Sequence, residues 1–470
     1  MRRKQRMGAA ILAAALFVTF LSSATIHAAD EIDYTIQDPY AGVDWANDTT
    51  YRADLHAHSY ATDGDTDFNQ MIEEHYAKGY DILSMTDHGT VDYSWVKPNT
   101  VPLLFGVLAI TQQQHWPTIT GLTEERWRQI STGSDRLNSK GEPQKMLRVS
   151  YGVEHNPTSF NNAHVCSWFV DYGNGILGGT SDYDTPIREV NARGGLCVIN
   201  HPGEYTGMKE VKDPDAAYGE GESYKIAKYA NLLTTYPNLL GIDMNSKTDG
   251  RTHNDRKLWD ILLQRVVPTG RNVFGMASSD AHQLNVVDSG WVMPVMPSNT
   301  EDNLKTALKN GAFFAGSHYI KNSKELAILA EETGVTLGEE WVADADEAEP
   351  TVTKITVDQQ GDSITLTTEN ALSVHWIADG NVIATGETLE LDKVSDQVTS
   401  YVRAELWSKG GVLYTQPFVL QYDGAPTATA PDFFDWGNVV RIFADILLPV
   451  LRWNPLFDAV WGWLTNTSGS

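Results

Sequence analysis

Between residues 51 and 317, short apolar runs typical of β-strands alternate with helical stretches, and this alternation constrains the fold more than any other feature. Clear examples of the apolar runs are 81–86, 195–200, 240–244 and 273–278. Neighbouring parallel strands need a crossover of about a dozen residues or more, which the intervening helices supply. The pattern therefore predicts an α/β domain over residues 51–330, as a parallel barrel or a doubly wound sheet.

The chain has 470 residues, which suits one large domain with smaller parts. Residues 95–147 interrupt the alternation and are predicted to be an insertion, with a helix that Thr123 caps. After an acidic linker at 340–349, the hydrophobic period changes to two, with turn residues at Asp379-Gly380 and Gly410-Gly411. We interpret residues 350–423 as a small antiparallel β-sandwich with half-buried strands.

The N-terminus has the pattern of an export signal. Four basic residues precede an apolar run over 7–21, and small residues end at Ala28 and Ala29. This predicts a signal peptide over 1–29 and a secreted protein, followed by an acidic leader at 30–50. An uncleaved membrane anchor is the alternative, although the run is short for a span of about 20 residues.

Net charge excludes one class of partner. Without the four basic residues of the predicted signal, the formal net charge moves from −26 to −30. So acidic a chain does not attract nucleic acid by bulk electrostatics, and we expect a small-molecule substrate instead.

Two other features leave alternatives open. Cys166 and Cys197 each lie in an apolar run. They are predicted to be two buried free thiols or, alternatively, to form a single disulfide. Residues 424–470 comprise a Pro/Thr-rich linker and an apolar tail with one helical face and several Trp residues. The tail is predicted to pack on the protein or a partner subunit, or to lie on a membrane surface.

Four groups of His, Asp and Glu residues occur at the ends of predicted strands. They centre on the segments 54–63, 86–89, 152–164 and 200–201 with 279–282. Because parallel barrels carry their active sites at the carboxyl ends of the strands, these groups are expected to meet. The candidate metal ligands are nine: His56, His58, Asp63, His88, Glu154, His164, His201, Asp280 and His282.

Imidazole and carboxylate groups at this density suit zinc, manganese or iron. His56 and His58 are two residues apart on a strand, so both side chains point the same way and can bind one cation together. His155 competes with His164 for one ligand position. Asp87 either supports a ligand histidine or caps its strand.

Over residues 51–317 this pattern resembles the PHP family, named for polymerase and histidinol phosphatase. The resemblance implies a distorted (β/α)7 TIM-like barrel with three divalent metal ions. The overall layout also looks like that of an exported subgroup with a small β domain after the barrel, some members of which resemble carbaryl hydrolase.

The resemblance also implies how the nine ligands are shared. His56, His58, Glu154 and Asp280 would hold one ion, and Glu154 would bridge to a second held with His164 and His201. Asp63, His88 and His282 would hold the third. Glu154, Asp280 and His201 are the predicted catalytic residues, because a water between two such ions loses a proton easily and becomes a nucleophile.

The substrate is less constrained than the metal site. Lys247 and Arg251, in a polar loop beyond a strand end, are predicted to contact a phosphate, or else are solvent-facing charges. The leading hypothesis is a phosphoesterase acting on a small phosphomonoester or phosphodiester. The alternatives are a carbamate, ester or amide hydrolase on the same ions, and a carbohydrate- or cell-wall-binding protein with an inactive barrel.

Overall fold

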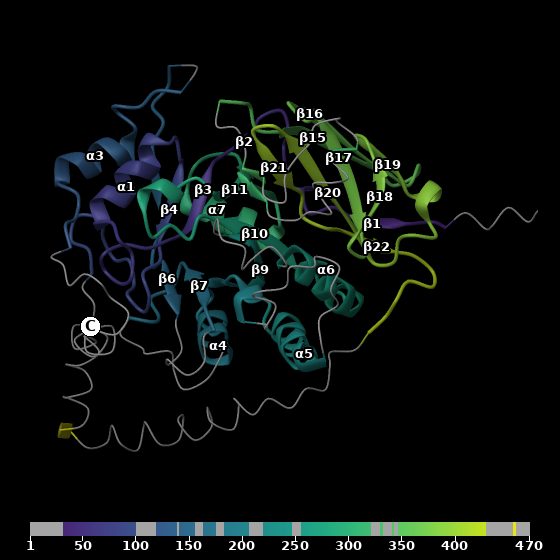
Figure 1. Cartoon of the computed structure of the whole chain (residues 1–470), viewed down its shortest axis with the longest axis horizontal. Helices are drawn as coiled ribbons and strands as arrows, with labels where there is room; N and C mark the ends of the chain where they lie inside the picture. Colours follow the sequence, from purple (N-terminus) through teal and green to yellow (C-terminus); the bar gives the residue numbers. More distant parts are fainter. Residues whose placement is uncertain are drawn as a thin grey trace, which may run out of the picture.

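The computed structural model describes residues 32–99, 119–138, 141–155, 163–174, 183–205, 220–246, 255–320, 330–331, 341–342, 346–428 and 455–456. The predicted signal peptide, Lys247, Arg251 and nearly all of the C-terminal tail lie outside these residues. The described part is a mixed α/β structure (Figure 1).

Seven strands form a closed ring: β3 (Ala53–Ala57), β4 (Ile82–Met85), β6 (Val153–His155), β7 (Val165–Trp168), β8 (Leu196–Ile199), β9 (Leu239–Ser246) and β10 (Phe274–Ser278). Regular pairing joins β3 to β4 and runs in order from β6 to β10. Two isolated parallel bridges close the ring, His88 with Glu154 and Ala57 with Ala281. Both bridges involve the candidate ligands or their neighbours, so closure itself assembles the site.

One strand of the ring departs from the expected parallel arrangement. β7 is antiparallel to both β6 and β8, whereas the other neighbours in the ring are parallel. The physical reason is the short connection from His155 to Val165, which is too short for the crossover that a parallel pair needs. As a consequence, the residue that precedes β7 lies at the same rim as the residues that follow the other strands.

Helices cover the outside of the ring (Figure 1). They are α1 (Phe68–Ala77), α3 (Glu124–Thr132), α4 (Asp184–Ala192), α5 (Glu220–Thr235), α6 (Asp255–Val266) and α7 (Glu301–Asn310), with the 3-10 turns η1 (Pro202–Tyr205), η2 (Val267–Thr269) and η3 (Leu284–Val286). The predicted cap of α3 is confirmed, because the Thr123 side chain accepts a hydrogen bond from the Arg126 N–H. The apolar faces of α4, α5 and α6 pack on β7, β8 and β9 in one core.

The strands outside the ring belong to one larger sheet that includes β3 and β4 and to two small separate sheets. They are β1 (Thr35–Gln37), β2 (Thr49–Thr50), β5 (Leu147–Arg148), β11 (Gly290–Met296), β12 (Phe313–Ser317), β13 (Tyr319–Ile320), β14 (Trp341–Val342), β15 (Thr351–Asp358), β16 (Ser363–Glu369), β17 (Ser373–Ala378), β18 (Asn381–Thr385), β19 (Thr388–Glu390), β20 (Tyr401–Ser408), β21 (Gly411–Tyr414) and β22 (Phe418–Gln421), with the 3-10 turn η4 (Leu391–Val394). A 12-stranded sheet runs from β1 through β22, β20, β21, β12 and β11 to β3 and β4.

The C-terminal strands are therefore continuous with the ring. β21 pairs with β12, so the segment interpreted as a separate sandwich shares its sheet with the first domain. Residues 30–50 do not stand apart as a leader, since β1 adds to β22 at the sheet edge. A second layer of β15, β16 and β19 packs on this sheet around a shared apolar core that includes Ile364, Trp376 and Leu406.

The expectation that β20 is half-buried is wrong. All eight of its residues are buried, because the second β layer covers one face and α6 contacts the other through Tyr401 and Arg403. The turn at Asp379-Gly380 is confirmed by the β17–β18 hairpin. In the β20–β21 hairpin, Ser408 pairs with Gly411, so the turn residues are Lys409 and Gly410 instead of Gly410 and Gly411.

The two cysteines are buried free thiols. Cys166 pairs with Val198 and Cys197 with Ser167, so they are offset by one residue on adjacent strands. Side chains alternate between faces along a strand, which puts Cys166 and Cys197 on opposite faces of the sheet and prevents a disulfide.

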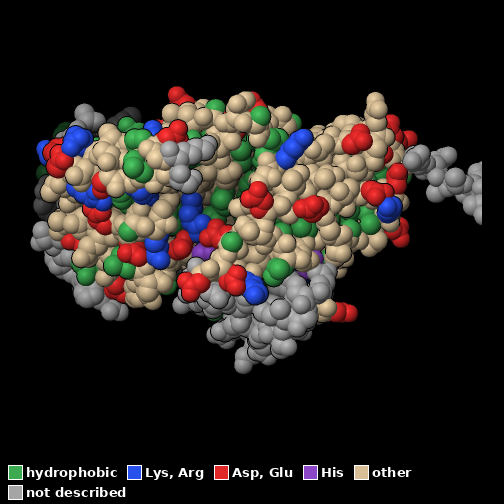
Figure 2. Space-filling view, turned by 90° about the horizontal axis from the view of Figure 1, so that it is seen from above, with side chains coloured by type: hydrophobic (Ala, Val, Ile, Leu, Met, Phe, Trp, Pro, Cys, Tyr) green, Lys and Arg blue, Asp and Glu red, His purple; other side chains and the backbone are tan. Residues whose placement is uncertain are grey.

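Charge is spread over the surface. Figure 2 shows acidic side chains over both the helix-bearing part and the β layers, with basic side chains between them. None of the described helices has the length and apolar character to cross a membrane.

Candidate metal centre

The structure brings all nine predicted ligands together at one rim of the ring. They form overlapping groups, each with ligand atoms within 4.8 Å of one another: His56, His58 and Glu154; His56, His201 and Asp280; His58, Asp63 and His88; His58, Asp280 and His282; and His88, Glu154 and His164. His56 and His58 point the same way as expected from strand geometry, with their Nε2 atoms 3.1 Å apart.

Glu154 stands at the centre of the cluster, and its two oxygens face different imidazoles. Oε2 lies 3.3 Å from His56 Nε2, 3.1 Å from His58 Nε2 and 3.1 Å from His88 Nδ1. Oε1 lies 3.1 Å from His164 Nδ1 and 3.5 Å from His201 Nε2. A carboxylate so placed is suited to bridge two cations, one at each oxygen.

Asp280 and Asp63 complete the cluster on either side of the histidines. Asp280 Oδ1 lies 3.3 Å from His56 Nε2 and 3.2 Å from His58 Nε2, and its Oδ2 lies 3.7 Å from His201 Nε2. Asp63 Oδ2 lies 3.3 Å from the Nε2 atoms of both His88 and His282.

Exposure divides the cluster into an inner and an outer part. The side chains of His56, His58, Glu154, His201 and Asp280 are at most 2% exposed. His88 and His164 are 11% and 12% exposed, and Asp63 and His282 are each 31% exposed. The cluster is therefore most accessible to solvent on the side of Asp63 and His282.

His164 is the histidine that joins Glu154, and His155 is not. His164 precedes the reversed strand β7, which turns its position toward the rim. His155 Nε2 instead lies 2.7 Å from Ser167 Oγ, and its ring packs against Tyr172. Burial lowers the pKa of His155 to about 4, so it is a neutral packing residue.

Close backbone approach and strain also shape the rim. A Cβ atom on Gly152 would lie 2.2 Å from Ser84 Oγ, so glycine allows β6 to approach β4 and bring Glu154 to His88. His201 and Asp280 have positive φ values of 24° and 44°, which cost non-glycine residues on the order of 1–3 kcal/mol each. Strained backbone at two ligand positions is typical of a functional site.

Buried charge sets the protonation of the cluster in the absence of metal. Burial alone would lower the pKa of His58, but Asp280 and Glu154 outweigh it and raise the pKa well above its usual range. Burial likewise opposes protonation of His56, whose pKa neighbouring acidic groups raise. For Glu154 burial would raise the pKa, yet the charges of His164, His56 and His88 hold it well below its usual range.

The residues fit divalent cations. Three carboxylates and six imidazoles are the ligand types of zinc, manganese and iron sites. Glu154 Oε2 and Asp63 Oδ1 are buried and accept no hydrogen bond among the described residues, although imidazole nitrogens surround them. A bound cation would satisfy these oxygens, and it would replace the protons that the raised histidine pKa values imply.

Residues behind the ligands were missed as functional from the sequence. Asn200 Nδ2 donates to Glu154 Oε1 over 2.6 Å. Asp54 accepts a hydrogen bond from Ser279 Oγ and lies 3.1 Å from His75 Nε2. Asp243 Oδ2 lies 4.0 Å from His56 Nδ1. Their positions in the sequence could have indicated them, because Asn200 directly precedes the ligand His201 and Asp54 is two residues before the ligand His56.

Asp87 anchors the loop that carries Asp63. Its carboxylate accepts hydrogen bonds from the Ser59 N–H, Ser59 Oγ and Thr62 Oγ1 over 2.8–2.9 Å. These contacts tie Asp87, which follows β4, to the loop after β3, where the ligand Asp63 follows Thr62 directly.

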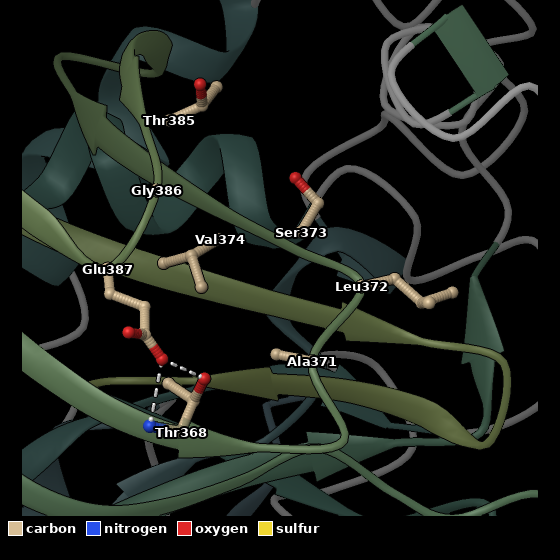
Figure 3. A pocket seen from close by; sticks show the side chains of 8 residues that line it. All are labelled: Thr368, Ala371, Leu372, Ser373, Val374, Thr385, Gly386 and Glu387. Carbon is tan, nitrogen blue, oxygen red and sulfur yellow. Dashed lines mark hydrogen bonds between the residues drawn. The ribbon is translucent and has the colours of Figure 1, made fainter.

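A separate hollow lies in the β layers (Figure 3). Its volume is about 440 Å³, and it is lined by Thr368, Ala371, Leu372, Ser373, Val374, Thr385, Gly386 and Glu387. The single carboxylate there, Glu387, accepts hydrogen bonds from the N–H and the hydroxyl of Thr368. The lining contains no histidine, so this hollow is unrelated to the metal centre.

No known protein family matches the sequence, and no curated protein matches it. Several solved structures are similar to this chain at low sequence identity, among them the following three. A two-domain protein from Bacteroides vulgatus, described as containing a predicted PHP-like metal-dependent phosphoesterase, is 15% identical over 84% of this chain and 91% of its own, with a TM-score of 0.38. PsfC from Pseudomonas syringae is 14% identical over 55% of this chain and 87% of its own, with a TM-score of 0.30.

The third is an amidohydrolase from Chromobacterium violaceum, solved with bound sulfate. It is 15% identical over 49% of this chain and 87% of its own, with a TM-score of 0.26. Likeness at this level does not by itself assign a family or an activity to this chain.

Proposed function

We propose that this chain is a metal-dependent hydrolase of the PHP type, with a phosphomonoester or phosphodiester of a small molecule as substrate. The observation that carries the proposal is the split environment of Glu154, whose two oxygens face separate sets of imidazoles. Together with Asp280, Asp63 and the strained backbone at His201, this is a centre for more than one cation.

The nine residues would bind zinc, manganese or iron in three groups. His56, His58 and Asp280 would hold one ion with Glu154, and His164 and His201 a second, with Glu154 between them. Asp63, His88 and His282 would hold a third at the exposed side. When bound, such ions lower the pKa of a water and take up negative charge from the reacting group.

The chain itself supplies orientation and exclusion of water. The inner ligands are buried, so water cannot compete for the ions from the interior of the ring. Packing around these side chains also fixes the direction in which Glu154, Asp280 and His201 present their ligand atoms. The exposed Asp63 and His282 leave one side open to a substrate. Lys247 and Arg251 follow Ser246 in the sequence, outside the described residues, and they are the proposed phosphate contacts.

The charge of the chain supports a small substrate over a polynucleotide. A strongly acidic protein repels a long polyanion, while a small anion reaches the cations by direct contact. We also propose that residues 1–29 direct export, and that the tail at 431–470 contacts a membrane surface or a second subunit. Mass analysis of the mature N-terminus and sedimentation of a tail deletion test these two points.

The deciding experiment uses protein stripped with a chelator and then reloaded with Zn²⁺, Mn²⁺ or Fe²⁺. The substrates are p-nitrophenyl phosphate, bis-p-nitrophenyl phosphate, p-nitrophenyl acetate and an aryl carbamate. We expect phosphoester turnover that depends on added ion, and slower cleavage of single-stranded DNA at low salt. Turnover of the ester or carbamate without any phosphoester turnover would move the proposal to the other hydrolase class, and ion-independent turnover would refute it.

A further inference from the structure

Asn200 is a fully buried amide directly behind Glu154. One N–H of Asn200 Nδ2 donates to Glu154 Oε1 over 2.6 Å, and Nδ2 also lies 3.0 Å from Cys166 Sγ. The amide is oriented from both sides, because Asn200 Oδ1 accepts from the Cys166 N–H over 3.3 Å. The Asn200 backbone N–H donates to the His164 carbonyl over 3.0 Å. Strand β7 therefore fixes Asn200 in place.

This arrangement constrains how Glu154 can bind ions. A carboxylate oxygen has two lone pairs in its plane, and the Asn200 amide uses one of those on Oε1. The other remains for a cation on the side of His164 and His201. To chelate one ion with both oxygens, the carboxylate would have to rotate away from Asn200 and break a charge-assisted hydrogen bond.

We propose that Asn200, held by Cys166, is a positioning residue that locks Glu154 in the bridging arrangement, with one oxygen toward each set of imidazoles. The inference rests on the metal centre of the proposed function but not on its substrate. It predicts that loss of the amide weakens the ion at His164 and His201 in particular. The inner side with His56, His58 and Asp280 keeps its own ligands.

The test titrates metal-free protein with Co²⁺, following heat release and visible absorption. In Asn200→Ala, one class of cobalt site should bind about 10- to 100-fold more weakly, the usual effect of removing a partner behind a ligand. The matched control is Asn299→Ala. Asn299 is also buried and donates from Nδ2 to the Asp81 carbonyl over 2.8 Å, away from the cluster. It should lose stability but bind cobalt as the unmodified chain does.

Two cysteine variants keep the test decisive if Asn200→Ala does not fold. Cys166→Ala removes the sulfur against which the amide rests, and should weaken the same cobalt site about 5-fold. Cys166→Ser keeps an acceptor and should bind nearly as the unmodified chain. Unchanged cobalt isotherms in Asn200→Ala and Cys166→Ala would overturn the positioning role alone. Failure of the unmodified chain to bind cobalt would refute the metal centre and the proposed function with it.

Discussion

Two clusters of buried charge lie in this molecule, and they differ in how their groups are satisfied. In the cluster between α6 and β20, Arg403 donates to both oxygens of Asp260 over 2.9 and 2.7 Å and to Glu405 over 2.6 Å. The Tyr401 hydroxyl donates to Asp260 as well. In the metal centre, by contrast, the buried atoms Glu154 Oε2 and Asp63 Oδ1 accept no hydrogen bond among the described residues.

The difference separates a structural cluster from a binding site. The Arg403 cluster contains its own cation, in a geometry that matches the carboxylate, and it joins the ring to the C-terminal strands. The metal centre contains three carboxylates that face imidazoles in the described part of the chain, and an imidazole is neutral at ordinary pH unless its pKa is raised. In metal-free protein, protons on these imidazoles compensate the buried carboxylates, and a bound cation would take the place of those protons.

The largest expected effect is the loss of turnover in Glu154→Gln. The amide cannot bridge two cations, so kcat/KM should fall at least ~1,000-fold, which corresponds to about 4 kcal/mol of charge stabilisation. Folding of the metal-free protein should persist, since glutamine has nearly the same shape, but at lower stability because the variant loses a carboxylate that faces several imidazoles. Steady-state kinetics, metal analysis and circular dichroism check this. Equal residual rates in Glu154→Gln and Asp63→Asn would contradict the central place of Glu154.

Arg403→Met should act on stability and leave the metal centre intact. It leaves Asp260 and Glu405 buried without their cation, at a cost of about 3–5 kcal/mol in the free energy of unfolding. Urea unfolding measures the loss, and metal content of the folded protein at low temperature should be unchanged. Adding Asp260→Asn should recover part of the stability. A loss of bound metal in Arg403→Met would mean that the two clusters are coupled.

Asp63→Asn should have a smaller effect on turnover than Glu154→Gln. Asp63 is partly exposed and lies nearer to the outer histidines, at 3.3 Å, than to His58, at 3.7 Å, so we expect one ion fewer and a 10- to 100-fold lower kcat/KM, about 1.4–2.7 kcal/mol. Asp65→Asn is the matched control, since the Asp65 carboxylate accepts a hydrogen bond from Gln283, and the backbone N–H that Asp65 donates to the His282 carbonyl is kept in the variant. Similar losses in both variants would indicate a loop effect instead of a lost ligand.

The smallest expected effect is the pH dependence of stabilisation by metal. In metal-free protein the raised pKa values of His56, His58 and His88 contribute stability that is present below about pH 6.5 and lost as pH rises through the folded values. The lowered pKa values of Asp63 and Glu154 contribute stability that is lost only as pH falls through those values. Protons therefore compete with metal most strongly on the acidic side.

Melting temperatures with Mn²⁺ and with chelator, measured from pH 5.5 to 8, check this dependence. The stabilisation by metal should increase from pH 5.5 to pH 8. It should reach roughly 3 kcal/mol where the free ion concentration is about 100 times the Kd. Glu154→Gln should show little increase. A constant difference in melting temperature between metal and chelator at every pH would contradict proton competition at the cluster.

The sequence by itself determined which residues meet at the rim. Ligand residues followed or preceded apolar strands, and strand ends of a closed ring must converge, so local pattern was enough to bring His56, Glu154, Asp280 and the others together. The choice between His155 and His164 was not local. It followed from the reversal of β7, which a nine-residue connection imposes and which turns the residue before the strand toward the centre.

Only the tertiary structure decided how the C-terminal strands sit and what supports the ligands. The period-two pattern predicted strands, but not that β21 would pair with β12 or that β1 would add to β22, because backbone hydrogen bonds at a sheet edge do not depend on side-chain identity. The same limit applied to Asn200 and Arg403. Each gains its role from a partner far away in sequence, at Glu154 and Asp260, and only folding brings such partners within hydrogen-bond distance.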